Sequence, residues 1–301
     1  MQNVIAVIWD FDKTLIDGYM QSPMFKDYCI DEKAFWNEVK EMPKIYAEQG
    51  IRVNPDTAYL IHFKRKAFDG TLKGLTNSKL REYGLKQHFY PGIPDFIRKT
   101  KNLLKSDQEC NEYNIRVEHY IVSTGFAEVI KGSPLAELVD GIWGCELIEG
   151  PDKDGNNVIS DACYTIDNTT KTRALFEINK GVNGKTNINV NTKMDEGQRR
   201  VAFENMIYIA DGPSDVPAFS VVRKNGGSAF AVYPKGDMRA MKQVEQLRKD
   251  ERIDYFAEAD YQDGSTTYMW ITNKIQEYAE RIKQQEKNKL SVPDIGPKHL
   301  I

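Results

Sequence analysis

Two aspartates, Asp10 and Asp12, directly follow an apolar run at residues 4–9. A run of this length is typical of a strand buried in a parallel sheet, and strand residues two apart point to the same side. The carboxylates would then face the crevice at the carboxyl end of the strand, where open α/β sheets bind ligands. Two carboxylates a few ångströms apart repel by about 4 kcal/mol at an effective dielectric near 20, so a cation or a proton must relieve them. Metal-assisted chemistry is the first hypothesis, and an Asx-type turn that caps local backbone is the alternative.

A second group of polar residues, Ser123-Thr124-Gly125, follows an apolar stretch at 116–122 that reads as another strand. The pattern predicts that a helix at 126–131 comes next. A hydroxyl and small residues at such a junction can present side-chain and backbone donors to an anion. Plain N-capping by one of the hydroxyls is the alternative.

Lys171 and a second pair of aspartates extend the pattern. Lys171 stands in the first turn of a helix that residues 168–170 are expected to cap, where a cation opposes the helix dipole unless an anion lies nearby. A third apolar strand, at 206–210, also ends in carboxylates, Asp211 and Asp215. Two buried strands with acidic carboxyl ends favour a functional site over turn chemistry at both places.

The remaining patterns supply the elements that would position these residues. Strands are expected at 228–233 and 255–261, a β-hairpin within 139–166, and helices at 93–104, 238–247 and 266–289. Strands that alternate with helices predict an α/β fold with a doubly wound parallel sheet.

Residues 17–88 read differently, as an all-helical insert after the first strand. Pro43 is expected to divide its first helix, Asn54-Pro55 to cap and open the second, and a short helix at 78–83 to follow. An insert at this place is a candidate lid over the carboxyl end of the sheet.

Composition narrows the function classes. The chain has 301 residues, 41% hydrophobic and 28% charged, which is ordinary for a globular protein of one large domain or two. A net charge of −3 argues against a general nucleic-acid binder. No window approaches the ~20 apolar residues of a membrane span, so no membrane association is expected and the cytoplasm is the default location. The four cysteines and four histidines show no metal-ligand spacing, so a metal here should be a hard, oxygen-bound ion such as Mg²⁺.

Taken together, the four motifs resemble those of haloacid dehalogenase (HAD) superfamily phosphatases. They are, in chain order, Asp10-Phe11-Asp12-Lys13-Thr14, Ser123-Thr124-Gly125, Lys171, and Asp211-Gly212-Pro213-Ser214-Asp215. The helical insert is similar to the C1-type cap of the phosphoserine-phosphatase-like branch. The resemblance implies a Rossmann-like core of residues 1–16 and 89–290, a cap of residues 17–88, and a disordered tail at 291–301.

The resemblance also implies a role for each motif residue. Asp10 would be the nucleophile that takes the phosphoryl group, and Asp12 the acid and then the base. Ser123 and Lys171 would act in catalysis and, with Thr124 and Gly125, would bind the phosphate. The ligands implied for Mg²⁺ are Asp10, the Asp12 backbone carbonyl, Asp211 and Asp215, the last either a direct ligand or a support for Lys171.

The expected activity is Mg²⁺-dependent hydrolysis of a small phosphorylated metabolite. A phosphotransferase or phosphomutase that uses the same aspartyl-phosphate, and a non-catalytic phosphate-ligand-binding protein, are the alternatives; carbon–halogen hydrolysis is disfavoured because it needs neither Asp12 nor a metal. Two features depart from the branch. Thr124 stands where a glycine is usual, and no acidic residue between 17 and 25 matches the cap glutamate of phosphoserine phosphatases. Phosphoserine is therefore not the expected substrate. Oligomeric state and the role of the polar segment 181–200 stay open.

Overall fold

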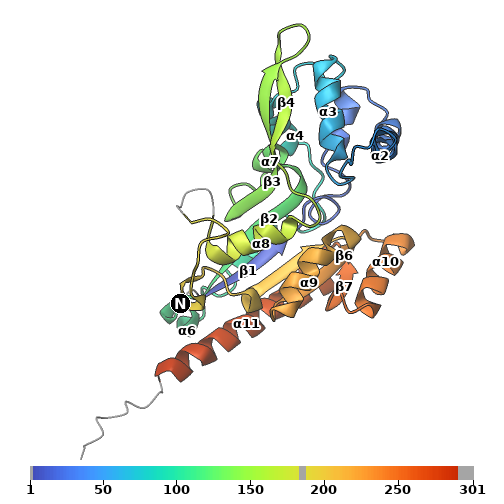
Figure 1. The fold of residues 1–301 in the computed structure, drawn as a ribbon. Helices are drawn as coiled ribbons and strands as arrows, with labels where there is room; N and C mark the ends of the chain where they lie inside the picture. The colour runs from blue at the N-terminus through green and yellow to red at the C-terminus, as the bar shows by residue number, and fades with distance from the viewer. Residues whose placement is uncertain (1–2, 183–187, 291–301) are drawn as a thin grey trace, which may run out of the picture.

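The protein is built on one seven-stranded sheet (Figure 1), seen in a computed structural model that describes residues 3–182 and 188–290. The strand order is β4-β3-β2-β1-β5-β6-β7, and every neighbouring pair is parallel except β3 and β4. The strands are β1 (Val4–Trp9), β2 (Arg116–Phe126), β3 (Gly141–Pro151), β4 (Asn157–Tyr164), β5 (Met206–Ala210), β6 (Ser228–Tyr233) and β7 (Tyr255–Glu258). The predicted doubly wound α/β sheet is thus confirmed.

Helices cover both faces of the sheet, as the all-apolar central strands require. Alternate residues of β1 enter two separate cores: Ile5 and Val7 one, Ala6 and Ile8 the other. The first core includes residues of α5 (Asp95–Lys101), α6 (Gln108–Glu112), α7 (Ala127–Lys131) and α11 (Thr266–Leu290). The second includes residues of α8 (Lys171–Lys180), α9 (Val216–Lys224) and α10 (Met238–Lys249).

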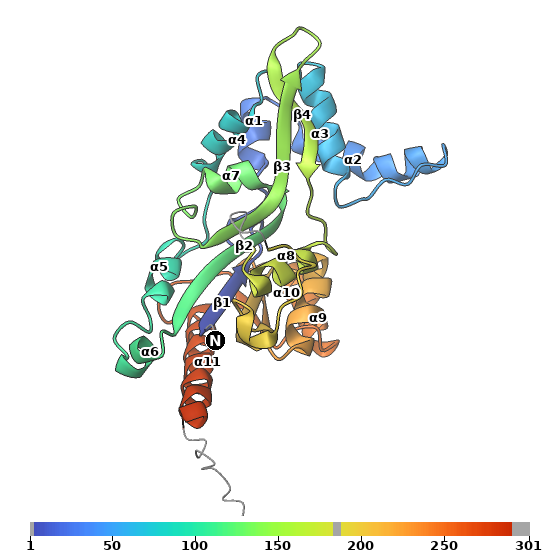
Figure 2. The ribbon, with the colours of Figure 1, turned by 60° about the vertical axis from the view of Figure 1, so that its left-hand side comes forward.

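The first four helices after β1 stand beyond the carboxyl end of the sheet (Figures 1 and 2). They are α1 (Ser22–Asp27), α2 (Glu32–Ala47), α3 (Ala58–Phe68) and α4 (Asn77–Gly84). Their interior is aromatic: the rings of Phe35 and Phe63 lie 4.8 Å apart, and Phe63 also meets Phe126 of β2 edge-on at 5.1 Å. The helical insert therefore shares its core with the sheet.

The β3–β4 hairpin extends beyond the sheet and lies beside these helices (Figure 2). The Asn77 side chain donates to the Leu147 carbonyl at 2.8 Å, and the Ile159 backbone N–H donates to the Leu75 carbonyl at 2.8 Å. One side-chain and one backbone hydrogen bond thus tie the hairpin to the insert.

Three local predictions were wrong. Pro43 lies inside an undivided α2, because the loss of one N–H donor is tolerated within 16 residues of helix. The second helix begins at Ala58; Asn54 instead makes an Asx turn, in which its Oδ1 accepts from the Asp56 N–H at 3.0 Å. β2 runs on to Phe126, so Ser123-Thr124-Gly125 are strand residues and cap no helix.

Other expectations fall partly or wholly outside the part of the chain that is described. The tail at 291–301 lies outside it, as does part of the polar segment 181–200. Short 3₁₀ turns occur at η1 (Glu196–Gln198), η2 (Phe203–Asn205) and η3 (Pro213–Asp215). Within residues 3–182 and 188–290, no helix has the length and apolar character that crossing a bilayer would need.

Candidate active site

Asp10 is the first residue after β1 and lies at the carboxyl edge of the sheet. Its backbone N–H donates to the Ile209 carbonyl at 2.9 Å, which continues the β1–β5 pairing by one more residue. This bond brings Asp10 beside the end of β5, where Asp211 follows. One oxygen of each of Asp10, Asp211 and Asp215 lies within 4.8 Å of the others. The two acidic strand ends found in the sequence therefore meet in space.

Lys171 lies in the middle of this group, with its side chain only 2% exposed. Its Nζ donates to Asp10 Oδ1 at 2.8 Å and to Asp215 Oδ1 at 2.6 Å. Burial alone lowers the pKa of a lysine, but the two carboxylates outweigh burial and raise the pKa of Lys171 above 10.5. The lysine is thus charged, which explains why a cation stands in the first turn of α8.

The ionised form of the carboxylates is disfavoured by burial and by their mutual repulsion. Burial raises the pKa of Asp10 from 3.8 to about 6, although Lys171 pulls it down. Burial, together with Asp10 and Asp215, raises the pKa of Asp211 from 3.8 to about 7. Lys171, together with Lys13 acting on Asp211, does not balance this group, so further positive charge would be bound favourably.

The excess of negative charge in this cluster favours the binding of a divalent cation such as Mg²⁺. The donors are carboxylate oxygens close together at a buried sheet edge, the ligand type that hard divalent cations prefer. Asp215 is already engaged: Oδ1 also accepts from the Tyr208 hydroxyl at 2.6 Å, and Oδ2 accepts from Ser214 Oγ at 2.9 Å. Asp10 and Asp211 have freer oxygens. The residues present therefore fit a divalent metal, with Asp215 better suited to holding Lys171 in place.

Asp12 lies near this group but is held differently. Its Oδ1 accepts from the Met20 backbone N–H at 3.0 Å, so the chain that leaves β1 folds back over the aspartate. Burial, and next the charge of Asp10, raise the pKa of Asp12 well above 3.8. A raised pKa favours the protonated carboxyl, the form that a general acid needs. The side chain is not one of the clustered metal-ligand candidates, so Asp12 could reach a metal only through its backbone carbonyl.

The residues 123–125 lie on β2, next to β1. The register pairs Trp9 with Ile121, which puts Ser123 just beyond the end of β1. Ser123 is buried, and its Oγ accepts from the Gly125 N–H at 3.0 Å. A Cβ at Gly125 would come within 2.3 Å of Met20 Cε, so Met20 packs closely against the strand at this glycine. Thr124 points its carbonyl at the helical insert, accepting from the Tyr59 hydroxyl at 2.6 Å.

Sequence reasoning missed three supports of the site. Tyr208, which holds Asp215, reads as an ordinary buried strand residue. The Thr14 hydroxyl lies 3.3 Å from Asp10 Oδ2 and donates to it. The N-cap residue of α8 is Thr170, within the predicted 168–170, but its side chain makes no capping hydrogen bond. Asp167 supports this turn instead: its Oδ1 accepts from the Thr170 N–H at 2.6 Å.

Cavities of similar size open on two sides of the carboxylates. One of about 410 Å³ is lined by Asp12, Thr124 and Gly125 together with residues of the insert. Another of about 400 Å³ is lined by Lys13 and Asp211.

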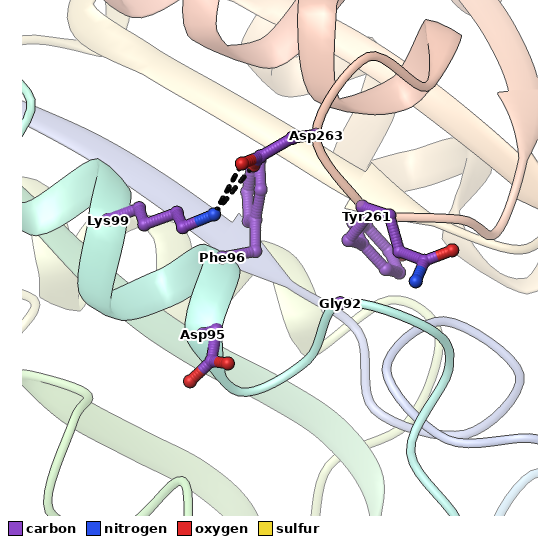
Figure 3. Close-up of a pocket in the computed structure, with 7 residues that line it drawn as sticks. Gly92, Asp95, Phe96, Lys99, Tyr261 and Asp263 are labelled. Atoms are coloured by element: carbon purple, nitrogen blue, oxygen red, sulfur yellow. Dashed lines mark hydrogen bonds and ion pairs between the residues drawn. The ribbon is translucent and has the colours of Figure 1, made fainter.

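A third cavity, of about 470 Å³, lies elsewhere, beside α5 (Figure 3). It contains none of the predicted site residues. Its Lys99 and Asp263 are exposed and paired with each other at 2.6 Å. Such an ion pair is typical of a solvated surface, so we do not place the chemistry there.

Comparison with known proteins agrees with this architecture. No family model matches the chain. An uncharacterized protein of Borreliella burgdorferi is 36% identical over 288 residues, which cover 91% of this chain and 97% of that protein. This chain belongs to the same family. A HAD family hydrolase from Salmonella enterica superposes over 85% of this chain and 67% of its own, at 15% identity and a TM-score of 0.51.

This chain has the haloacid dehalogenase fold. In this chain β1 lies at the centre of the sheet, and helices α1–α4 follow it. A phosphoserine phosphatase, solved as a phospho-aspartyl intermediate analogue, aligns over 85% of this chain and 94% of its own, at 17% identity and a TM-score of 0.49. At such identities the likeness concerns the HAD fold, and the activity has to be argued from the site.

Proposed function

We propose that this chain is a Mg²⁺-dependent hydrolase of small phosphate monoesters that works through an aspartyl-phosphate on Asp10. The observation that carries the proposal is the buried group of Asp10, Lys171 and Asp215, with Asp211 beside it and Asp12 close by. Phosphoryl transfer needs a positioned nucleophile and positive charge around the transferring group, and this set can supply both. Asp12 adds the acid that a poor leaving group needs.

In the first step, an Asp10 oxygen attacks phosphorus and the bond from phosphorus to the leaving alcohol oxygen breaks. Asp12 donates its proton to that oxygen, so the alcohol leaves neutral. Burial and the charge of Asp10 raise the pKa of Asp12, which favours the protonated form that this step uses. Lys171 holds Asp10 in one orientation and offers its charge to the phosphoryl oxygens.

In the second step, water attacks phosphorus of the acyl phosphate while Asp12, now ionised, takes the water's proton. Inorganic phosphate leaves, Asp10 is free again and Asp12 is protonated again, so the cycle balances. Asp10, the Asp12 carbonyl and Asp211 would hold Mg²⁺, with Asp215 orienting Lys171. The metal would supply positive charge to the phosphoryl oxygens. Ser123 and the backbone of Thr124 and Gly125 are proposed to bind the phosphate, and the reaction to take place in the cytoplasm.

The test is phosphate release by the wild type with Mg²⁺ and after its removal by EDTA, across sugar phosphates, nucleotides, phosphoamino acids and an aryl phosphate. Asp10→Asn should fold normally and release no phosphate. Asp12→Asn should lower kcat by about 10²–10⁴-fold, the usual contribution of a general acid. Asp27→Asn is the matched control, because Asp27 is an exposed carboxylate of α1 that pairs with Lys86.

Turnover retained by Asp10→Asn would refute the covalent mechanism, and release in EDTA equal to that in Mg²⁺ would refute the metal requirement. Transfer of the phosphoryl group to an added alcohol, with no release to water, would identify a phosphotransferase. Tight binding of phosphate esters without any turnover would identify a binding protein.

A further inference from the structure

The cavity between the helical insert and the sheet is where the leaving group would sit, if the proposed function holds. It has a volume of about 410 Å³ and is lined by Asp12 and Thr124 on the sheet side. Asp12 is the residue that would protonate the leaving oxygen, so the alcohol must enter this cavity and not its neighbour beside Lys13. The remaining lining residues therefore contact the part of the substrate that distinguishes one phosphate ester from another.

One wall of the cavity is aromatic. Trp36 of α2 lies between Tyr19 and Tyr59, with ring centroids 5.6 Å and 6.2 Å away. Tyr19 is 41% exposed and Trp36 is half-buried, whereas Phe35 in the insert's core is 2% exposed. Tyr59 is 6% exposed and joins the wall to that core. The wall is also held in place, since the Tyr59 hydroxyl donates to the Thr124 carbonyl at 2.6 Å. A preformed aromatic wall of this kind fits a flat ring.

A single buried amide faces the same cavity. Gln21 is 3% exposed and lines the cavity, yet its Oε1 has no hydrogen-bond partner within the described residues. Leaving a buried acceptor unpaired is costly unless a ligand pairs with it. A leaving group with a hydrogen-bonding edge would supply that partner.

The charges around the cavity argue for a neutral group. Lys40 and Asp56 both line it, so its rim carries no excess of either sign. The face of Tyr19 is already taken by Lys13, whose Nζ lies 4.1 Å from the ring centroid. Aromatic side chains can also surround a cation such as a quaternary ammonium. Here the charge of Lys13 would repel such a cation, and a quaternary ammonium has no group that could donate a hydrogen bond to Gln21, so a neutral ring is favoured.

We propose that the leaving group recognised here is a planar, polar aromatic ring system of the kind that a nucleoside carries, stacked on Trp36 and hydrogen-bonded to Gln21. Trp36, Tyr59 and Gln21 are then the residues that determine specificity.

The experiment compares pairs of esters that differ only in the ring. A nucleoside 5′-monophosphate is compared with ribose 5-phosphate, and benzyl phosphate with cyclohexylmethyl phosphate, by kcat/KM in Mg²⁺; in each pair both esters release an alkyl alcohol, so the intrinsic reactivity of the leaving group is matched. The wild type should prefer the aromatic member of each pair by about 10- to 100-fold, the range expected for stacking on one aromatic side chain. Trp36→Leu should remove most of this preference, because it should lower kcat/KM for the nucleotide much more than for ribose 5-phosphate, which has no aromatic ring to stack.

Two further variants separate the contacts. Trp36→Phe should keep a good part of the preference, and it also serves if the leucine variant does not fold. Gln21→Leu should reduce kcat/KM more for the nucleotide than for benzyl phosphate, whose ring has no hydrogen-bonding edge. Tyr46→Leu is the matched control, because Tyr46 is on the same helix but pairs with Arg65 outside the cavity.

Equal kcat/KM for the two members of each pair, or a preference that Trp36→Leu leaves intact, would overturn the inference and leave the phosphatase proposal standing. Hydrolysis of none of the esters would overturn the phosphatase proposal, and the inference with it.

Discussion

Replacing Lys171 by methionine should make the folded protein depend on an external cation. The lysine is the only charge of its sign that hydrogen-bonds Asp10 and Asp215 among the described residues, at 2.8 Å and 2.6 Å. Methionine keeps nearly the same volume and removes the charge. The buried carboxylates would then face each other with no internal partner, in a site from which water is largely excluded.

The expected loss can be estimated from this geometry. Removing one member of a buried ion pair costs about 3–5 kcal/mol, because the other member stays buried without its partner. Protonation offsets part of this cost, because the carboxylates already have raised pKa values of about 6 for Asp10 and about 7 for Asp211. We therefore expect a loss near the lower limit, about 3 kcal/mol in EDTA at pH 7. At about 2–4 °C per kcal/mol for a chain of this size, the melting temperature should fall by roughly 6–12 °C.

The stability of the variant should also depend on pH, because the buried carboxylates bind protons. In the variant, the native cluster holds protons at a pH where the unfolded carboxylates, near 3.8, are ionised. The native state then binds more protons than the unfolded state, so the stability of the variant should fall further as pH rises from 6 to 8. Mg²⁺ should return part of the lost stability, because it binds the folded cluster and not the unfolded chain.

The assay is thermal and urea unfolding of both proteins in EDTA and in Mg²⁺ at several pH values. Lys283→Met is the control: its side chain is also buried, 7% exposed, but its partners Asp107 and Glu280 are 37% and 71% exposed. Water can solvate those carboxylates, so the control should lose no more than about 1 kcal/mol. A Lys171→Met protein within about 1 kcal/mol of wild type in EDTA, with no response to Mg²⁺, would refute the electrostatic account of the site.

Two further predictions concern the supports of the site. Gly125→Ala should cost no more than about 1 kcal/mol of stability, since the new Cβ, 2.3 Å from Met20 Cε, meets the flexible end of a side chain that can move aside; a loss of about 3 kcal/mol in urea unfolding, the upper range for overpacking a core, would contradict this account. His119, fully buried with the Trp9 indole N–H donating to its Nδ1 at 3.0 Å, has its pKa lowered by burial from 6.5 to about 3. The unfolded chain takes up this proton first, so the stability that His119 contributes is complete above pH 6.5 and falls below it, by about 2 kcal/mol at pH 5. His119→Gln should flatten the decline of stability between pH 6.5 and 5, and an unchanged slope would show that other groups cause it.

The sequence pattern was enough to predict the parallel sheet and the proximity of the aspartates that follow its strands. The apolar runs that become β1 and β5 can be buried only in a covered parallel sheet, and parallel strands end at the same edge. Asp10 and Asp211 were therefore predictable neighbours. Lys171 was detectable as well, because a lysine in the first turn of a helix opposes the dipole.

The hydrogen bonds that fix each side chain of the site could not be predicted from the sequence and are seen in the tertiary structure. Tyr208 alternates on its strand as any core residue would, and nothing in its spacing shows that its hydroxyl meets Asp215. The aromatic wall of the cavity could not be predicted from the sequence for the same reason. Trp36 and Tyr59 stand at helical spacing, which is the same whether such residues fill a core or line a cavity. Periodicity tells which face of a helix is apolar, but what that face meets depends on segments far along the chain. The carboxylate chemistry could be read locally, whereas the substrate pocket arises from contacts between distant residues.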